Sequence, residues 1–240
     1  MNEPTSLIND PSRLESLLAF GILDTPPEKE FADFALLAAQ VGGTPAAMIT
    51  FVDDKREWVK SCWGATAVEF SLEIAFGAYT MLEKGGLLLV PDARIDERFC
   101  NHPLINQVGG FVSYAGVPLV AATGQVVGAL GIFGYEPLRL KEEQIRSLQL
   151  LAGQIIRWME ARQKIAALEC RYSEVLKFAG KAAHDLKSPL CSISLMAELF
   201  RELYGEKLDP NGVEMLISIG DITNQLARQI DDLLTDRISC

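Results

Sequence analysis

The sequence predicts an α+β domain, followed by one long helix and then a helical hairpin. Two observations carry this prediction. As far as Tyr135, segments with helical spacing alternate with apolar segments of strand length. After Pro137, proline is absent as far as Ser188, and apolar residues recur in alternating steps of three and four. The chain of 240 residues fits one or two domains, with a change of character near residue 137.

The composition is that of an ordinary folded protein. Hydrophobic residues make up 49% of the chain and charged residues 22%, which excludes a largely disordered protein. The formal charge of −10 argues against a nucleic-acid partner. Residues 1–11 lack the features of a secretory signal, and the uncharged stretch 108–135 is broken by glycines and Pro118. The five cysteines form no CxxC pair, so no metal site is expected. We therefore expect a cytoplasmic protein that has no membrane partner.

Two helices are expected before the first strand. Ser12 fits a capping box with Glu15 at the start of a short helix. Thr25 fits the N-cap of a second helix with Pro26 at its first position, and Gly42-Gly43 ends that helix. The residues expected to be buried on the second helix are Phe31, Phe34, Ala35, Leu37 and Ala38.

Apolar and alternating segments then predict an antiparallel sheet. The expected strands are 46–52 and 57–63, which form a hairpin around Asp53-Asp54, then 87–90, then a second hairpin of 111–120 and 125–135. Four glycines in the second hairpin follow no phosphate-loop spacing, so we expect them to serve close packing or bulges. They are Gly124, Gly128, Gly131 and Gly134. Residues 12–137 thus form one domain in which helices flank the sheet.

The rest of the chain is expected to be helical, with a coiled-coil helix over 138–171 that continues into a two-helix hairpin over 172–240. The long helix should run from about Lys141 to Tyr204 and bend at Pro189. Its apolar seam consists of Trp158, Ala161, Ile165, Leu168, Tyr172, Val175, Ala179, Ala182 and Leu186. Asp209-Pro210 fits the start of the second helix. Two helices bury such faces poorly, so we expect a homodimer that forms a four-helix bundle.

One histidine carries the chemistry of the hairpin. From His184 to Leu190 the sequence reads His-Asp-Leu-Lys-Ser-Pro-Leu, which closely resembles the H-box of sensor histidine kinases. The resemblance implies that this histidine accepts phosphate from ATP and passes it to an aspartate of a response regulator. On the predicted seam, His184 falls at the outermost helix position, where two different partners can reach it. His184 is therefore the expected phosphoacceptor.

Three neighbours of the histidine have expected roles. Asp185 can hold one ring N–H of His184 and raise the nucleophilicity of the other ring nitrogen. Pro189 has no N–H, so the helix should bend beside the histidine. Ser188 occupies the position where this family usually has threonine, and the resemblance implies a part in dephosphorylating the regulator.

The first domain resembles the GAF sensor domains that precede histidine kinases. The matching segments include Leu17–Glu28, Arg56–Ser61, Val90–Ala93 and Tyr114–Leu119. The resemblance implies an antiparallel sheet with a small-molecule pocket on one face, and the candidate pocket residues are Phe76, Tyr79 and Tyr114. The ligand is not identified. Where this group often has Ser-Phe-Cys-Ala-His, the chain reads Ala75-Phe76-Gly77-Ala78-Tyr79, which disfavours a metal, haem or thiol role at that place.

Together these features predict a GAF-regulated phosphoacceptor of two-component signalling. The boxes of an ATP-binding domain are missing from the sequence, so we expect ATP and Mg²⁺ to act through a separate catalytic domain, and the chain not to phosphorylate itself unaided. The alternative is a non-catalytic regulator that pairs with a full-length kinase through the helical bundle. A GAF-type small-molecule enzyme is disfavoured because its cysteine cluster is absent.

Overall fold

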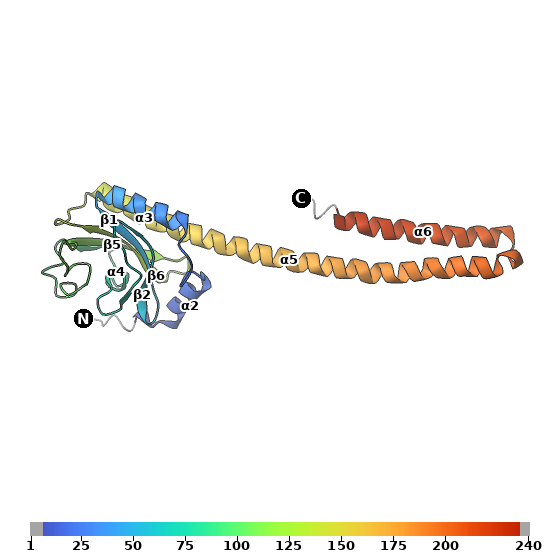
Figure 1. The fold of residues 1–240 in the computed structure, drawn as a ribbon, viewed down its shortest axis with the longest axis horizontal. Helices are drawn as coiled ribbons and strands as arrows, with labels where there is room; N and C mark the ends of the chain where they lie inside the picture. The colour runs from blue at the N-terminus through green and yellow to red at the C-terminus, as the bar shows by residue number, and fades with distance from the viewer. Residues whose placement is uncertain (1–6, 236–240) are drawn as a thin grey trace. The chain divides into compact units, whose positions relative to one another are not determined.

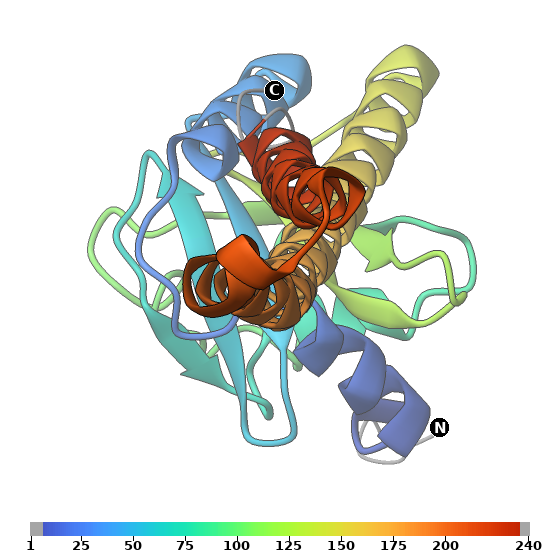
Figure 2. The same cartoon turned by 90° about the vertical axis from the view of Figure 1, so that its right-hand side faces the viewer.

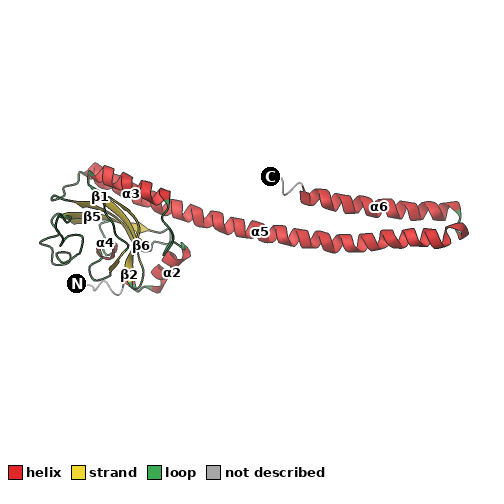
Figure 3. Ribbon diagram, in the orientation of Figure 1, coloured by secondary structure: helices red, strands yellow, loops and turns green. Residues whose placement is uncertain are grey.

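The computed structural model describes residues 7–235 of the chain. Figures 1 and 3 show their helices and strands. The chain separates into two compact units, with the division between Gln163 and Lys164. This division falls inside helix α5 (Glu142–Tyr204). The last residues of the expected hairpin, 236–240, lie outside the described residues.

The first unit is built on a six-stranded antiparallel sheet with the order β3-β2-β1-β6-β5-β4. Its strands are β1 (Ala46–Val52), β2 (Arg56–Trp63), β3 (Glu69–Ser71), β4 (Leu88–Val90), β5 (Ser113–Val120) and β6 (Val126–Gly134). Both expected hairpins are confirmed, β1 with β2 and β5 with β6. The sequence did not predict β3, whose three residues are too few to show a period.

Helices cover one face of the sheet. Helix α3 (Lys29–Gly42) and the first part of α5 pack there, and the Phe31 ring makes an edge contact with Trp158 at 5.2 Å between centroids. Trp158 thus packs inside the first unit, although its spacing had placed it on the coiled-coil seam. Gly128 is required on this sheet, because a Cβ there would lie 2.0 Å from the Thr50 carbonyl oxygen. That contact confirms the close-packing role expected for Gly128.

The other face of the sheet is covered by the short helix α4 (Phe76–Met81) and by loops. The core on this side is aromatic. Phe76 stacks on Phe99 and Tyr114 with centroid distances of 4.1 and 4.4 Å, and Phe133 meets Phe76 edge-on at 5.4 Å. This aromatic layer lies against the sheet and contains the candidate pocket.

Both expected helix starts in the first unit are wrong. Helix α2 (Pro11–Ala19) is capped by Asp10, whose carboxylate accepts the Ser12 N–H at 2.8 Å. Proline at the first helical position after an aspartate outcompetes a cap at Ser12. Helix α3 begins at Lys29 rather than after Thr25, because the Thr25 hydroxyl donates instead to the Ile22 carbonyl at 2.6 Å.

One burial prediction on α3 also fails. Leu37 is 46% exposed, because the buried stripe of α3 passes through Phe31, Ala35 and Ala38 and leaves Leu37 outside it.

The second unit contains the rest of α5, a short 3₁₀ turn (Gly205–Lys207) and α6 (Pro210–Thr235). Helix α5 runs from Glu142 to Tyr204 and continues through Pro189, which matches the predicted range within one residue. Asp209 caps α6, since its side chain accepts the Gly212 N–H at 2.8 Å. Figures 1 and 2 both place α6 alongside α5.

The contact between α5 and α6 uses small residues. Ala183, Ala197 and Thr223 are buried in this unit. By contrast, most of the predicted apolar seam is exposed, with Leu168 at 63% and Leu186 at 58%. One hairpin therefore leaves a long apolar face uncovered.

Candidate functional site

His184 is exposed on helix α5. Its side chain is 84% accessible, and its Nδ1 atom lies 3.5 Å from Oδ1 of Asp185. A proton on Nδ1 would point at this carboxylate and leave the lone pair on Nε2. The second histidine of the chain, His102, is fully buried. His184 is thus the accessible imidazole.

The residues after His184 connect α5 with α6 and with its own next turn. The Lys187 ammonium donates to the Asp231 carboxylate of α6, which joins the two helices just beyond the histidine. The Ser188 carbonyl accepts the Ser192 hydroxyl at 3.0 Å, and the Ser188 side chain lies in an exposed part of the helix. Pro189 is exposed within α5 and offers no N–H to the Asp185 carbonyl.

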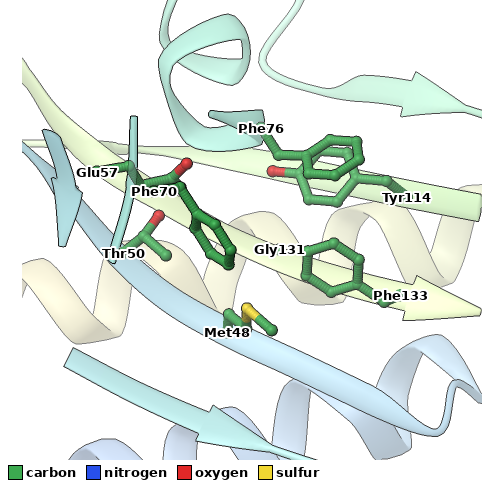
Figure 4. Close-up of a pocket in the computed structure, with 8 residues that line it drawn as sticks. All are labelled: Met48, Thr50, Glu57, Phe70, Phe76, Tyr114, Gly131 and Phe133. Atoms are coloured by element: carbon green, nitrogen blue, oxygen red, sulfur yellow. The ribbon is translucent and has the colours of Figure 1, made fainter. Parts of the chain in front are cut away.

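In the first unit, a small cavity lies within the aromatic layer. Figure 4 shows its lining residues, which are Met48, Thr50, Glu57, Phe70, Phe76, Tyr114, Gly131 and Phe133. The cavity leaves about 10 Å³ for the centre of a water molecule, which is about the space that one water needs. Phe76 and Tyr114 are among the expected pocket residues. Tyr79 does not line this cavity, and its ring packs against Phe99 at 5.1 Å.

Glu57 is the polar residue of the cavity that sequence reasoning missed. The residue is 3% exposed. Its Oε1 accepts the Gly77 N–H at 3.0 Å, while its Oε2 has no hydrogen-bond partner among the described residues. Burial raises the pKa of Glu57 to about 7, and the Thr50 hydroxyl and the Gly77 N–H oppose this rise. The signal in the sequence that could have identified Glu57 is an acidic residue at a strand position that faces the core.

Two other polar side chains of this aromatic layer, Tyr114 and His102, differ in their hydrogen bonds. The Tyr114 hydroxyl lies 2.8 Å from the Thr80 hydroxyl, which itself donates to the Phe76 carbonyl at 2.8 Å. His102 packs beside Phe70 and Phe76, with ring centroids 4.7 and 4.8 Å away. Its Nδ1 accepts the Leu104 N–H at 3.1 Å, and burial lowers its pKa to about 4. The neutral ring therefore carries its proton on Nε2, which has no partner among the described residues.

On the opposite face of the sheet, a network of ion pairs joins β2 to α5. We call Lys60, Glu28 and Arg162 the Glu28 network. The Lys60 side chain is fully buried, and its Nζ donates to Glu28 Oε1 at 2.7 Å, to Thr25 Oγ1 at 2.6 Å and to the Pro26 carbonyl at 2.7 Å. The other Glu28 oxygen accepts from Arg162 of α5. Sequence reasoning missed this network because its members are far apart along the chain.

Two family models match the chain. The model for the GAF domain matches residues 25–157, and the model for the His Kinase A (phospho-acceptor) domain matches residues 174–237. The first match spans the sheet and the start of α5, and the second spans the hairpin with His184. Within residues 7–235, no helix combines the length and apolarity needed to cross a membrane.

Individual proteins resemble part of the chain. The chain is 31% identical over 117 residues to the cyclic di-GMP phosphodiesterase PA2567 of Pseudomonas aeruginosa, a match that covers 49% of this chain and 20% of that protein. The GAF domain of an Acinetobacter phosphoenolpyruvate-protein phosphotransferase superposes with a TM-score of 0.48 at 15% identity, over 66% of this chain and 99% of that one. A domain of a putative two-component sensor histidine kinase from Sinorhizobium meliloti superposes with a TM-score of 0.46 at 15% identity, over 60% of this chain and 97% of that one. The chain belongs to the GAF domain family, and its GAF domain is followed by a His Kinase A phospho-acceptor domain, the arrangement of a GAF–HisKA sensor histidine kinase.

Proposed function

We propose that this chain senses a signal through its GAF domain and carries a phosphoryl group on His184 in a two-component pathway. The observation that carries the proposal is the position of His184. Its imidazole is 84% exposed within the segment that matches the phospho-acceptor domain, and it adjoins Asp185. An exposed nucleophile meets the requirement that both a phosphate donor and a phosphate acceptor reach it.

The chemistry follows from the two adjacent side chains. Nε2 of His184 attacks the γ-phosphorus of ATP held by a separate ATP-binding domain with Mg²⁺, the bond to the bridging oxygen breaks, and ADP leaves. Asp185 holds the Nδ1 proton and stabilises the positive charge that develops on the ring. The phosphoryl group then passes from nitrogen to an aspartate oxygen of a response regulator. In this scheme Ser188 lies beside the site where the regulator docks, and Pro189 weakens the helix there.

The proposed acceptor works as a homodimer. The exposed apolar residues of α5 recur in steps of three and four over Ile165, Leu168, Tyr172 and Val175 and again over Ile193, Met196, Phe200 and Leu203, with Leu186 between the two runs. Helix α6 adds Met215, Ile219, Ile222, Leu226 and Leu233. A second hairpin that presents the same two stripes would bury them in a four-helix bundle. We place such a dimer in the cytoplasm, where its response regulator would be found.

The proposed signal path runs along one strand. Strand β2 presents Glu57 to the cavity, and Lys60 on the same strand joins the Glu28 network that holds Arg162 of α5. A change in the cavity that displaces β2 would therefore act on α5, the helix that carries His184.

Phosphoryl transfer tests this function. The full chain is mixed with an isolated ATP-binding domain of a related kinase and labelled ATP, beside His184→Gln and an acceptor hairpin known to work with that domain. The proposal expects an acid-labile, base-stable label on the wild type and none on the variant. If the control hairpin is labelled while the folded, dimeric chain is not, the proposal fails, and the exposed seam would instead support a regulator that pairs with a full-length kinase.

A further inference from the structure

We propose that the GAF cavity is a site for a small ammonium compound, which the Glu57 carboxylate binds within a wall of aromatic rings. The proposal deepens the sensing role proposed above by naming the chemical class of the signal. It rests on the unpartnered Oε2 of Glu57, on the composition of the cavity wall and on the space inside it.

The carboxyl group lacks a counter-charge. Glu57 is 3% exposed, and its Oε2 has no hydrogen-bond partner among the described residues. None of the eight residues that line the cavity is Lys, Arg or His. A buried carboxylate is normally paired, and one that faces a cavity without a cation is placed to receive one from outside the chain.

The wall of the cavity suits a cation better than a neutral donor. Half of its lining residues are aromatic, namely Phe70, Phe76, Tyr114 and Phe133. Figure 4 shows Phe70 beside Glu57 and Thr50, with the other three rings across the cavity. Aromatic rings attract cations through their quadrupole, most strongly where water is excluded. An acidic group among aromatic rings is the combination that recognises organic ammonium ions.

The available space limits the size of the ligand. The cavity holds about one water molecule as it stands, so ammonium fits directly. Phe70 is the wall residue best able to move, because it is half-buried on the three-residue edge strand β3. Outward movement of Phe70 would therefore admit a methylated or longer ammonium compound.

Protons should compete with the ligand. Glu57 and Tyr114 are the titratable groups among the lining residues, which come from β1, β2, β3, α4, β5 and β6. Burial raises the pKa of both side chains, so that Tyr114 stays neutral near pH 7 while Glu57 exchanges its proton there. A cation that binds the carboxylate displaces that proton, and its affinity should rise about tenfold between pH 6 and pH 8.

Methionine methyl NMR reports the site directly, because Met48 lines the cavity and the chain has only six methionines. The full chain with ¹³C-labelled methionine methyl groups is titrated with ammonium, then with methylammonium, at constant ionic strength. Methanol serves as the neutral analogue of methylammonium. The proposal expects a saturable shift of the Met48 signal with the two cations, at least tenfold weaker binding of methanol, and the pH dependence given above.

Two matched variants isolate the charge. Glu57→Gln keeps the size of the side chain and an oxygen for the Gly77 N–H, and it should weaken methylammonium binding at least tenfold. Glu69→Gln removes an exposed carboxylate of β3 and should leave binding unchanged. Equal binding of methanol and methylammonium to the wild type would overturn the proposal without any variant, as would unchanged binding by a folded Glu57→Gln chain.

The site and the phosphoacceptor fail separately. His184→Gln should bind methylammonium with wild-type affinity, because the substitution is in the other unit. Phosphorylation of His184 without ammonium binding overturns only the site proposed here. Ammonium binding without phosphorylation overturns only the proposed function.

Discussion

Replacing Lys60 with methionine tests how strongly the Glu28 network holds the first domain together. Methionine matches the length of the lysine stem, so the change removes the ammonium and its hydrogen bonds while filling most of the volume. The Lys60 side chain is fully buried and makes an ion pair and two further hydrogen bonds. Its ammonium also lies 5.1 Å from the centroid of the Phe31 ring. Each of these contacts is lost.

The expected loss of unfolding free energy is about 3 kcal/mol. Removing one partner of a buried pair costs roughly 3–5 kcal/mol. We expect the lower end, because the Glu28 side chain is 21% exposed and keeps Arg162 as a partner. The matched control is Arg162→Met. The Arg162 side chain is 51% exposed, and a surface pair of this kind is worth about 0.5 kcal/mol.

Urea unfolding followed by tryptophan fluorescence measures both variants. The chain has three tryptophans, Trp58, Trp63 and Trp158, and all lie in the first unit. The dependence of free energy on urea should stay constant, so that midpoints report stability. If Lys60→Met costs less than about 1 kcal/mol, or Arg162→Met costs as much as Lys60→Met, the reasoning about the buried ammonium is refuted.

Three further predictions follow from the glycines, from the buried acid and from the seam. Gly128→Ala should destabilise the first unit by about 3 kcal/mol or more, since its Cβ would lie 2.0 Å from a backbone oxygen. Gly180→Ala has open space around it and should increase the free energy of unfolding by up to about 1 kcal/mol. Urea unfolding followed by circular dichroism distinguishes the two variants. The folded state keeps a proton on Glu57 between pH 4.5 and about 7 that the unfolded chain releases, so stability falls with rising pH across that window. The free energy of unfolding of Glu57→Gln should therefore rise relative to that of the wild type by up to about 3 kcal/mol as pH rises from 4.5 to 7. A difference between the two proteins that stays constant with pH would contradict the assignment. Inserting one or two residues near Glu169 should change His184 phosphorylation more than inserting a whole heptad, because only the former rotates the seam; equal effects would count against coupling through α5.

Local periodicity explains what the sequence could predict. The range of β1 was predicted without error, and α5 within one residue of its start, because long segments with a constant period need no distant partner to identify them. The outward position of His184 followed from the same heptad spacing. The family resemblances rested on strings of adjacent residues, and the two matching family models confirm them.

The errors arise where distant residues decide between local alternatives. Threonine is a common N-cap residue, but the Thr25 hydroxyl donates to the Ile22 carbonyl and accepts from Lys60 of β2, so α3 starts later. Trp158 has the spacing of a seam residue, yet it packs against Phe31 inside the first unit. Such contacts are formed only when the chain folds, and no window of neighbouring residues contains them.

The candidate sites divide in the same way. His184 and Asp185 are adjacent, so their string could be recognised directly. The cavity assembles Met48, Glu57, Tyr114 and Phe133 from four different strands. Only the sheet order brings these residues together, and the loss of solvent around Glu57 is a property of that assembly.

The most direct test of the account is to locate the phosphoryl group. The chain is phosphorylated with a separate ATP-binding domain, freed of ATP, and digested at neutral pH for mass spectrometry before and after addition of a response-regulator receiver domain. One phosphoryl group is expected, on the peptide that contains His184 and not on the one that contains buried His102, and it should then pass to a receiver aspartate. Phosphate on a serine, threonine or aspartate of this chain, or equal labelling of His184→Gln, would contradict it.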